Sequence, residues 1–193
     1  MPYAESAVRV LIATVFLAAA VGKVRSRRSF AAFTASVGQL NVLPGAATRA
    51  AAVAVVAAEW LVCSLVLSPW TRLAGIGLAL AAALLAVFAI AIARVVARGT
   101  RAVCRCFGSG SSGPLGVRHI VRNVLLAGLA AGAAGLSLLR ETAPAGPWGL
   151  AVSALAGLLV GGCVAAFDSI AELFRPAGPA HSSRPARSPR PGR

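Results

Sequence analysis

Long apolar stretches recur along the chain, separated by short segments rich in arginine, glycine and proline. Five of them approach or exceed the about 20 residues that a helix needs to cross the hydrocarbon of a bilayer. Their expected bounds are residues 6–24, 49–67, 72–97, 119–139 and 148–174. The pattern therefore predicts an all-α, polytopic membrane helix bundle whose chain crosses the bilayer five times.

A shorter amphipathic segment lies between the first and second spans. Phe30, Phe33, Val37 and Leu40 follow one another at intervals of three or four residues, which places them on one face of a helix. Ser29 directly precedes this segment and is the candidate N-cap. We expect a short helix that lies at the membrane interface.

Composition excludes most other classes of protein. Of the 193 residues, 58% are hydrophobic and 12% are charged, whereas a soluble domain carries about 25% charged residues. A soluble globular enzyme and a mainly disordered chain are both excluded on these grounds. The net charge of +14 is found in clusters between the apolar spans, so we expect a lipid bilayer as partner and no nucleic acid.

The basic residues also predict an orientation. Of the 19 Lys and Arg residues, three are assigned to one side of the membrane, namely Arg9 before the first span, Arg72 and Arg140. The other 16, among them Lys23 in the connection after the first span, are assigned to the opposite side. The positive-inside rule then predicts a multi-pass cell-membrane protein with its N-terminus outside and its C-terminus in the cytoplasm. The first span has its basic cluster after it, so we expect a retained helix and not a signal peptide. Residues 176–193, rich in Pro, Arg and Ser, predict a disordered basic tail.

The connection between the third and fourth spans carries the most reactive chemistry. It contains Cys104-Arg105-Cys106-Phe107-Gly108 in a polar, glycine-rich segment, which the charge count places in the cytoplasm. Neighbouring arginines favour the thiolate, the reactive form of cysteine. A disulfide between residues two apart closes a small, strained ring, and strained disulfides tend to be catalytic or regulatory.

Three interpretations of this cysteine pair remain open. It is a thiol–disulfide exchange site, a part of a metal site, or two unrelated loop cysteines. His119 is the only further ligand nearby, whereas structural zinc takes four, so we expect no metal. Cys63 and Cys163 lie within spans at depths that differ by about 10 Å, and we expect both to be small buried hydrophobic residues.

Glu59 lies within the second span, where an ionisable side chain is expensive and is usually functional or paired. It shares a helix face with Cys63, four residues later. One hypothesis makes it a proton acceptor or a polar anchor for a partner group. The other makes it a structural hydrogen-bonding group whose partner is Asn123, Ser64 or Arg122.

Two further features of the spans suggest structural roles. Arg122 and Asn123 open the fourth span and are candidates for positioning the cysteine loop. Glycines in the fourth and fifth spans favour close packing of helices in lipid. These glycines are Gly128, Gly132, Gly135, Gly157 and Gly161.

Several short motifs occur in a specific order along residues 5–140. They are Val21-Gly22-Lys23, Leu43-Pro44, Glu59, Arg98-Gly99, Cys104-x-Cys106-Phe107-Gly108 and Arg122-Asn123. This order resembles the family of the methylamine utilisation protein MauE, within the broader DoxX-like group of small four-helix membrane proteins. The resemblance implies a four-helix core over residues 1–140, to which this chain adds a further transmembrane helix over 141–175 and the tail 176–193.

The resemblance also implies a function. Members of the family are linked to the maturation of the disulfide-rich small subunit of methylamine dehydrogenase and are expected to work beside a thioredoxin-like protein. Cys104 and Cys106 would then be the redox pair. The supporting residues would be Glu59, Arg105, Phe107, Gly108, Arg122 and Asn123.

Two alternatives come from other functional classes. The first is a non-catalytic membrane scaffold that positions a thioredoxin-like partner. The second is a quinone-binding or small-molecule-binding membrane protein centred on Glu59. Only the second would require a cofactor, a quinone, and otherwise we expect none.

Overall fold

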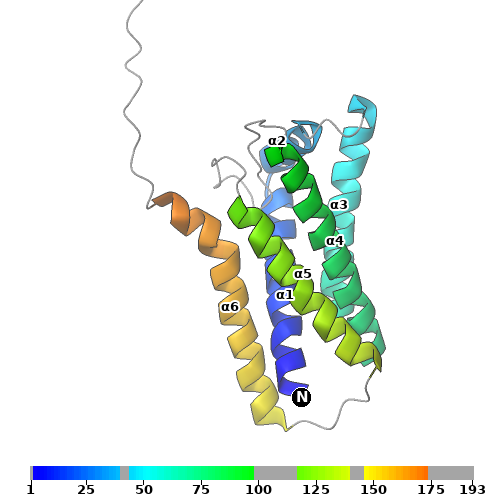
Figure 1. The fold of residues 1–193 in the computed structure, drawn as a ribbon, viewed down its shortest axis with the longest axis vertical. Helices are drawn as coiled ribbons and strands as arrows, with labels where there is room; N and C mark the ends of the chain where they lie inside the picture. Colours follow the sequence, from blue (N-terminus) through cyan, green and yellow to red (C-terminus); the bar gives the residue numbers. More distant parts are fainter. Residues whose placement is uncertain (1, 40–43, 98–116, 140–145, 174–193) are drawn as a thin grey trace, which may run out of the picture.

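The structure is a computed structural model that describes residues 2–39, 44–97, 117–139 and 146–173. Helices are the only regular elements in these residues (Figure 1). They are α1 (Pro2–Val24), α2 (Arg27–Gln39), α3 (Gly45–Val66), α4 (Thr71–Ala97), α5 (Val117–Leu139) and α6 (Pro147–Leu173). The all-α fold class is confirmed.

Five of these helices, all except α2, are long and apolar enough to cross a membrane. They match the five predicted spans, and every predicted end lies within four residues of the observed one. Agreement is close because the length of an apolar run is a local property of the sequence. The tail 176–193 lies outside the described residues.

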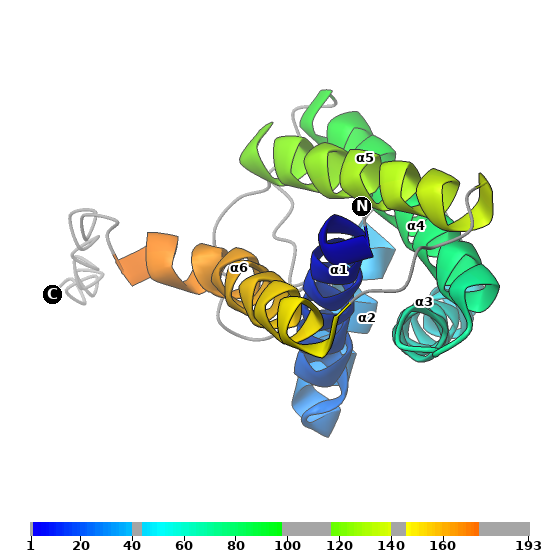
Figure 2. The same cartoon turned by 90° about the horizontal axis from the view of Figure 1, so that it is seen from below.

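The first helix, α1, is the centre of the bundle and contacts every other helix. Figure 2 shows α6 on one side of α1, with α3, α4 and α5 on the other. The buried side chains of α1 therefore cover a broad arc of its surface, as expected for a helix with neighbours on several sides. Those of its middle turns are Leu11, Ile12, Ala13, Val15, Phe16, Ala19 and Ala20.

Small residues bring α4 close to its two neighbours. A side chain at Gly75 would meet Leu138 of α5, and one at Gly77 would meet Leu65 and Val66 of α3. The buried face of α5 that meets the bundle also contains small residues, among them Ala130. Close backbone approach of this kind is the usual basis of helix association in lipid.

Two of the predicted packing glycines, Gly157 and Gly161, lie where α6 contacts α1. A side chain at Gly157 would meet the backbone of Ala7, and one at Gly161 would meet Leu11 and Thr14. Among the described residues, α6 packs on α1 alone. The packing prediction is confirmed for these two glycines.

The same prediction is wrong, within the described chain, for the three glycines of α5. An added side chain at Gly128, Gly132 or Gly135 would have no described atom within 4 Å. The buried face of α5 is formed by Leu126, Ala130, Ala133, Ala134 and Ser137. Because successive residues turn by 100° around a helix, the glycines fall outside that face.

The predicted amphipathic segment forms α2, but its cap differs from the expected one. The hydroxyl of Ser26, not of Ser29, accepts the first-turn hydrogen bond, from the backbone N–H of Ser29 at 3.0 Å. The helix therefore begins at Arg27, three residues before the apolar pattern does. On its apolar face, Phe33 is buried against the bundle.

Polar side chains near the start of α1 tie it to other helices. Arg9 donates hydrogen bonds to the carbonyl oxygens of Val66, at 3.2 Å, and Ser68, at 2.6 Å. These carbonyls lie at the end of α3, where the helix itself supplies no donors. The sequence placed Arg9 before the first span, but it lies within α1 and its side chain caps α3.

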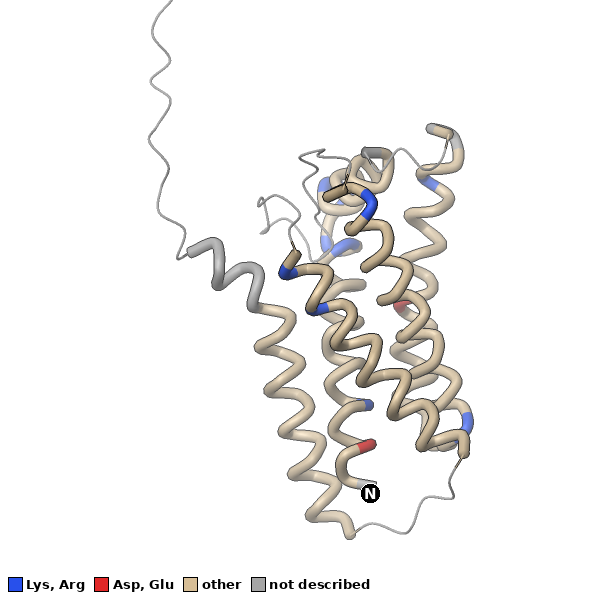
Figure 3. The backbone as a smooth tube through the Cα atoms, in the orientation of Figure 1, with Lys and Arg blue, Asp and Glu red and all other residues tan. Residues whose placement is uncertain are grey.

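The opposite end of the bundle gathers most of the arginines (Figure 3). At this end α1, α4 and α6 finish and α3 and α5 begin. We call it the basic end. The helix bounds place these described arginines there: Arg25, Arg27, Arg28, Arg49, Arg94, Arg118 and Arg122. Its location in the cytoplasm stays a prediction of the positive-inside rule.

The close contact between α1 and α6 gives a direct test. Replacing Gly161 with Leu puts a side chain where the α1 backbone lies, so we expect the free energy of unfolding in detergent micelles to fall by about 1–3 kcal/mol. The matched control is Gly162→Leu, because nothing lies within 4 Å of a side chain added there. Equal stability of the two variants would contradict this packing of α6.

Candidate functional site

A buried ion pair joins α1 to α3. The Nζ atom of Lys23 lies 2.5 Å from Oε1 of Glu59 and donates a hydrogen bond to it. Lys23 and Glu59 are each only 2% exposed. Lys23 belongs to the last turn of α1, whereas Glu59 lies well inside α3. Because side chains on a helix tilt toward its N-terminus, a lysine at the end of α1 can reach back into the bundle.

An aromatic ring from α2 completes the surroundings of the lysine. Nζ of Lys23 lies 5.0 Å from the centre of the Phe33 ring, within the range of a cation–π interaction. Phe33 is itself 2% exposed. Lys23, Glu59 and Phe33 thus bring together one residue from each of the first three helices.

The pair satisfies the physical requirement that an ionisable residue in an apolar bundle has a partner. Oε1 of Glu59 is bound by Lys23, and Oε2 is buried without a hydrogen bond from any described residue. Removing either partner would leave an uncompensated group in a site closed to water. The arrangement can therefore hold α1, α2 and α3 together.

The sequence identified Glu59 correctly as a residue that needs a partner but named the wrong partners. The prediction that Lys23 lies in the connection after the first span is wrong, because Lys23 lies within α1 and is buried. Of the expected partners, Ser64 donates instead to the carbonyl of Trp60 in its own helix. Its position inside the last turn of an apolar span is the signal in the sequence that could have identified Lys23 as the partner of Glu59.

Cys63 lies one turn after Glu59 and faces the same interface with α1. Its thiol is buried, and Sγ lies 3.8 Å from the carbonyl oxygen of Ala13. It fits the predicted role of a small buried residue. The prediction is wrong for Cys163, which is exposed because α6 packs only its other face on α1. Both thiols are free.

The cysteine loop itself, with Cys104, Arg105, Cys106, Phe107 and Gly108, lies outside the described residues. The structure does fix the helix ends on either side of it. Ala97 ends α4 and Val117 begins α5, both at the basic end (Figure 1).

The two residues expected to position that loop lie in the first turns of α5. Arg122 and Asn123 are both partly buried. Arg122 lines a cleft between α5 and α6 together with Arg118, and the partner of Glu59 is Lys23 instead of either residue. Their role toward the cysteine loop stays a prediction.

Comparison with known proteins identifies the family. The model of the family described as methylamine utilisation protein MauE matches residues 1–137. The chain belongs to the MauE family. The match covers α1 to α4 and nearly all of α5, and it includes Lys23, Glu59 and the cysteine loop.

A curated member of the MauE family supports this assignment. The methylamine utilization protein MauE of Paracoccus denitrificans is 37% identical to the chain over 126 residues. The aligned part covers 64% of this chain and 64% of that relative. No solved structure matches the chain. Helix α6 lies beyond the residues that the MauE family model matches.

The ion pair predicts a distinctive pattern of stability. Lys23→Met and Glu59→Met each leave one buried member of the pair alone, so each should lower the free energy of unfolding by about 3–5 kcal/mol. The double variant Lys23→Met/Glu59→Met removes both charges and should lose less than the sum of the two single changes. Chemical unfolding in mixed detergent micelles measures all three.

Arg25 provides the control for this series. It is exposed just beyond the end of α1, and Arg25→Met should change the stability by no more than about 0.5 kcal/mol. Strictly additive effects of the Lys23 and Glu59 substitutions would contradict a direct interaction between them.

Proposed function

We propose that this protein is a thiol-redox protein of the membrane that assists the maturation of a disulfide-containing partner in methylamine utilisation. Cys104 and Cys106 form its redox pair. The observation that carries the proposal is the Cys-x-Cys motif in the connection between α4 and α5, inside the part of the chain that the MauE family model matches.

The proposed reaction is an exchange between two dithiol–disulfide pairs. A thiolate of a thioredoxin-like partner attacks one sulfur of the Cys104–Cys106 disulfide and forms a mixed disulfide. The second thiolate of the partner then displaces this chain's sulfur, which leaves the partner oxidised and both cysteines reduced. Two electrons move from the partner to this chain, and the reverse sequence returns them.

The charges of the helix ends support this role. Arg94 lies in the last turn of α4, and Arg118 lies in the first turn of α5. They belong to the two helix ends that the loop joins, and positive charge favours the thiolate that attacks in each exchange step. Cys63 is a poor second reactant, because its thiol is buried between α3 and α1.

The surroundings of Glu59 favour a structural role over the quinone alternative. Its carboxylate is engaged by Lys23 within the bundle. It lines neither the cleft between α5 and α6 nor the surface hollow beside α2. We therefore propose that Glu59 supports the redox site only by holding the helices at the basic end in place.

The redox proposal is tested with cysteine variants of the full chain. In a Cys63→Ala/Cys163→Ala background, Cys104 and Cys106 should become available to a thiol-specific polyethylene-glycol maleimide together as the redox buffer is made more reducing. Adding Cys106→Ser should leave Cys104 free at every potential. On a gel, the reduced pair should shift by about two reagent masses, and the Cys106→Ser variant should shift by about one.

Function is measured as growth on methylamine of a host whose own copy is removed. Cys104→Ser and Cys106→Ser should each abolish growth, whereas Cys63→Ala and Cys163→Ala should support it. Growth with both loop cysteines replaced would overturn the redox role and favour the scaffold alternative.

A further inference from the structure

A surface hollow lies beside α2, between that helix and the start of α3 at the basic end. Its volume is about 970 Å³, within the range of sites that bind small molecules. Part of its wall is apolar and consists of Val24 of α1 and of Phe30, Ala31 and Ala35 of α2. Among the described helices, α2 contacts only α1 and α3, so its outer side faces away from the bundle (Figure 2).

Two arginines from different helices also line the hollow. Arg27 is the first residue of α2, and Arg49 lies in the first two turns of α3. Both side chains are exposed, and neither makes a hydrogen bond or an ion pair with a described residue. The hollow therefore combines an apolar wall with two positive charges that lack a partner in the described part of the chain.

The sequence offers few anions that could balance these charges from within the chain. Its five acidic residues are Glu5, Glu59, Glu141, Asp168 and Glu172. Glu5 and Glu59 are buried inside the bundle. Glu141 follows α5, whose last turn lies opposite the basic end (Figure 1), and the other two belong to α6, which contacts only α1 among the described helices. We therefore expect the balancing anion to come from outside the chain.

The hollow lies at the level where the apolar spans end. Val24 is the last residue of the first candidate span, and Thr48 and Arg49 are the second and third residues of the next one. The ends of a span mark the boundary between the hydrocarbon and the headgroups of a bilayer. Val21 and Leu17 precede Val24 by one and two turns on α1 and are exposed apolar residues, so the apolar wall continues toward the membrane interior.

We propose that this hollow binds an anionic phospholipid of the leaflet at the basic end. Its phosphate group lies beside Arg27 and Arg49, where guanidinium groups form charge-assisted hydrogen bonds with the phosphate oxygens. One acyl chain lies along Val24 and Val21. An acidic segment of a soluble partner would satisfy the two arginines but would leave the apolar wall below them uncovered, so the combination of charge, wall and depth favours a phospholipid.

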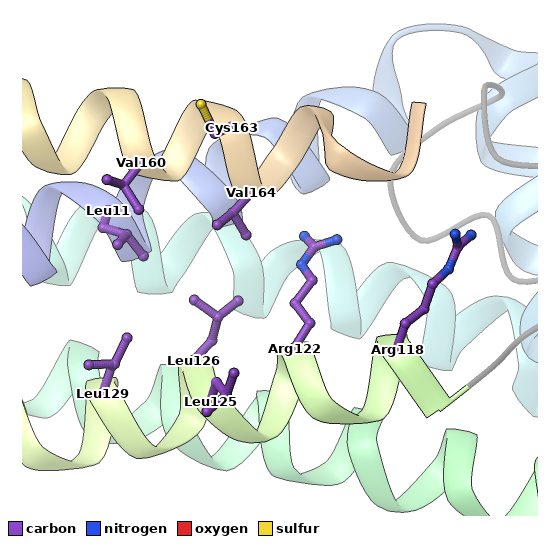
Figure 4. A pocket seen from close by; sticks show the side chains of 9 residues that line it. All are labelled: Leu11, Arg118, Arg122, Leu125, Leu126, Leu129, Val160, Cys163 and Val164. Carbon is purple, nitrogen blue, oxygen red and sulfur yellow. The ribbon is translucent and has the colours of Figure 1, made fainter. Parts of the chain in front are cut away.

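The cleft between α5 and α6 is a separate opening that also contains arginines. The described residues that line it are all different from those of the hollow. Its Arg118 and Arg122 extend from α5 toward α6 (Figure 4). Arg118 donates a hydrogen bond to Nε2 of His119 at 3.4 Å, and Arg122 also has an interacting group. The arginines of the hollow are therefore better placed to bind an external anion.

A phospholipid in the hollow would hold α2 in place from its outer side. On the inner side, Phe33 of α2 is buried and lies over Lys23. The helix would then be fixed between the buried ion pair and the membrane. The proposed site includes no residue of the cysteine loop, so its test is independent of the redox proposal.

Native mass spectrometry of the full chain tests the site. The protein is released from mild detergent micelles that contain equal amounts of dioleoyl phosphatidylglycerol and dioleoyl phosphatidylcholine. We expect one phosphatidylglycerol to be retained in preference. Arg27→Gln/Arg49→Gln should lower its occupancy about tenfold or more, because each lost charge-assisted hydrogen bond is worth at least about a factor of ten.

Matched variants separate this site from general attraction to charge. Arg28→Gln/Arg94→Gln removes two exposed arginines of the basic end that do not line the hollow, and it should keep the lipid. Arg27→Lys/Arg49→Lys retains both charges and should keep the preference for the anionic lipid, which guards against misfolding as the cause of a loss.

A second pair of variants tests the location by size. Ala31→Trp places a large side chain in the hollow and should expel the lipid. Ala50→Trp, at an exposed alanine of α3 outside the hollow, should retain it. An excess of soluble glycerol phosphate should leave the lipid bound, because it lacks the acyl chain that contacts Val24 and Val21.

Four results would overturn the proposal. The first two are equal retention of the two phospholipids and equal losses in the Arg27/Arg49 and Arg28/Arg94 glutamine variants. The third is displacement of the lipid by glycerol phosphate, which would indicate a site for soluble anions. The fourth is loss of the lipid in Arg118→Gln with full retention in Arg27→Gln/Arg49→Gln, which would place it in the cleft between α5 and α6.

Discussion

The buried contact between Lys23 and Glu59 is the interaction on which the basic end of this bundle depends. An apolar bundle offers no water to an isolated charge, so each residue is tolerable only because the other is present. The contact fixes the end of α1 against α3. It also explains a role for α2, whose Phe33 covers the lysine. The MauE family model matches residues 1–137, and this range includes both the buried pair and the cysteine loop.

Different interactions stabilise the two ends of the bundle. At the end where the chain begins, polar side chains of α1 form hydrogen bonds with groups of other helices. Glu5 accepts a hydrogen bond from Ser137, and Arg9 caps α3. At the basic end, arginines gather at the helix termini (Figure 3). Positive charge of this kind favours the thiolate form of cysteine, so the redox proposal draws on this property of the basic end.

Much of the fold could be predicted because spans are set locally. The length of each apolar run gave the five transmembrane helices, and the amphipathic spacing around Phe33 gave α2. Contacts between helices could not be predicted in this way. The pairing of Lys23 with Glu59 depends on how α1 packs on α3, and the exposure of Cys163 depends on α6 having a single neighbour among the described helices. The same limit explains Gly128, which lies on a face of α5 that no described helix covers.

Of the candidate site, the sequence indicated Glu59 and the loop cysteines but not Lys23. Glu59 stood out because a carboxylate within a span is rare, and the loop cysteines stood out because of their spacing. The partner of Glu59 is 36 residues away along the chain, and no local pattern encodes such a pairing.

Disulfide maturation of exported proteins takes place outside the cytoplasm, whereas the charge count places the loop of Cys104 and Cys106 inside.

Sided labelling of the loop cysteines in intact cells is therefore the most direct test of the account. In a Cys63→Ala/Cys163→Ala variant, a membrane-permeant maleimide is compared with an impermeant one, each before and after reduction. The account predicts labelling by the permeant reagent alone, and only after reduction, as expected for a cytoplasmic disulfide. Labelling by the impermeant reagent would contradict the orientation of the basic end and place the exchange with the partner outside the cell.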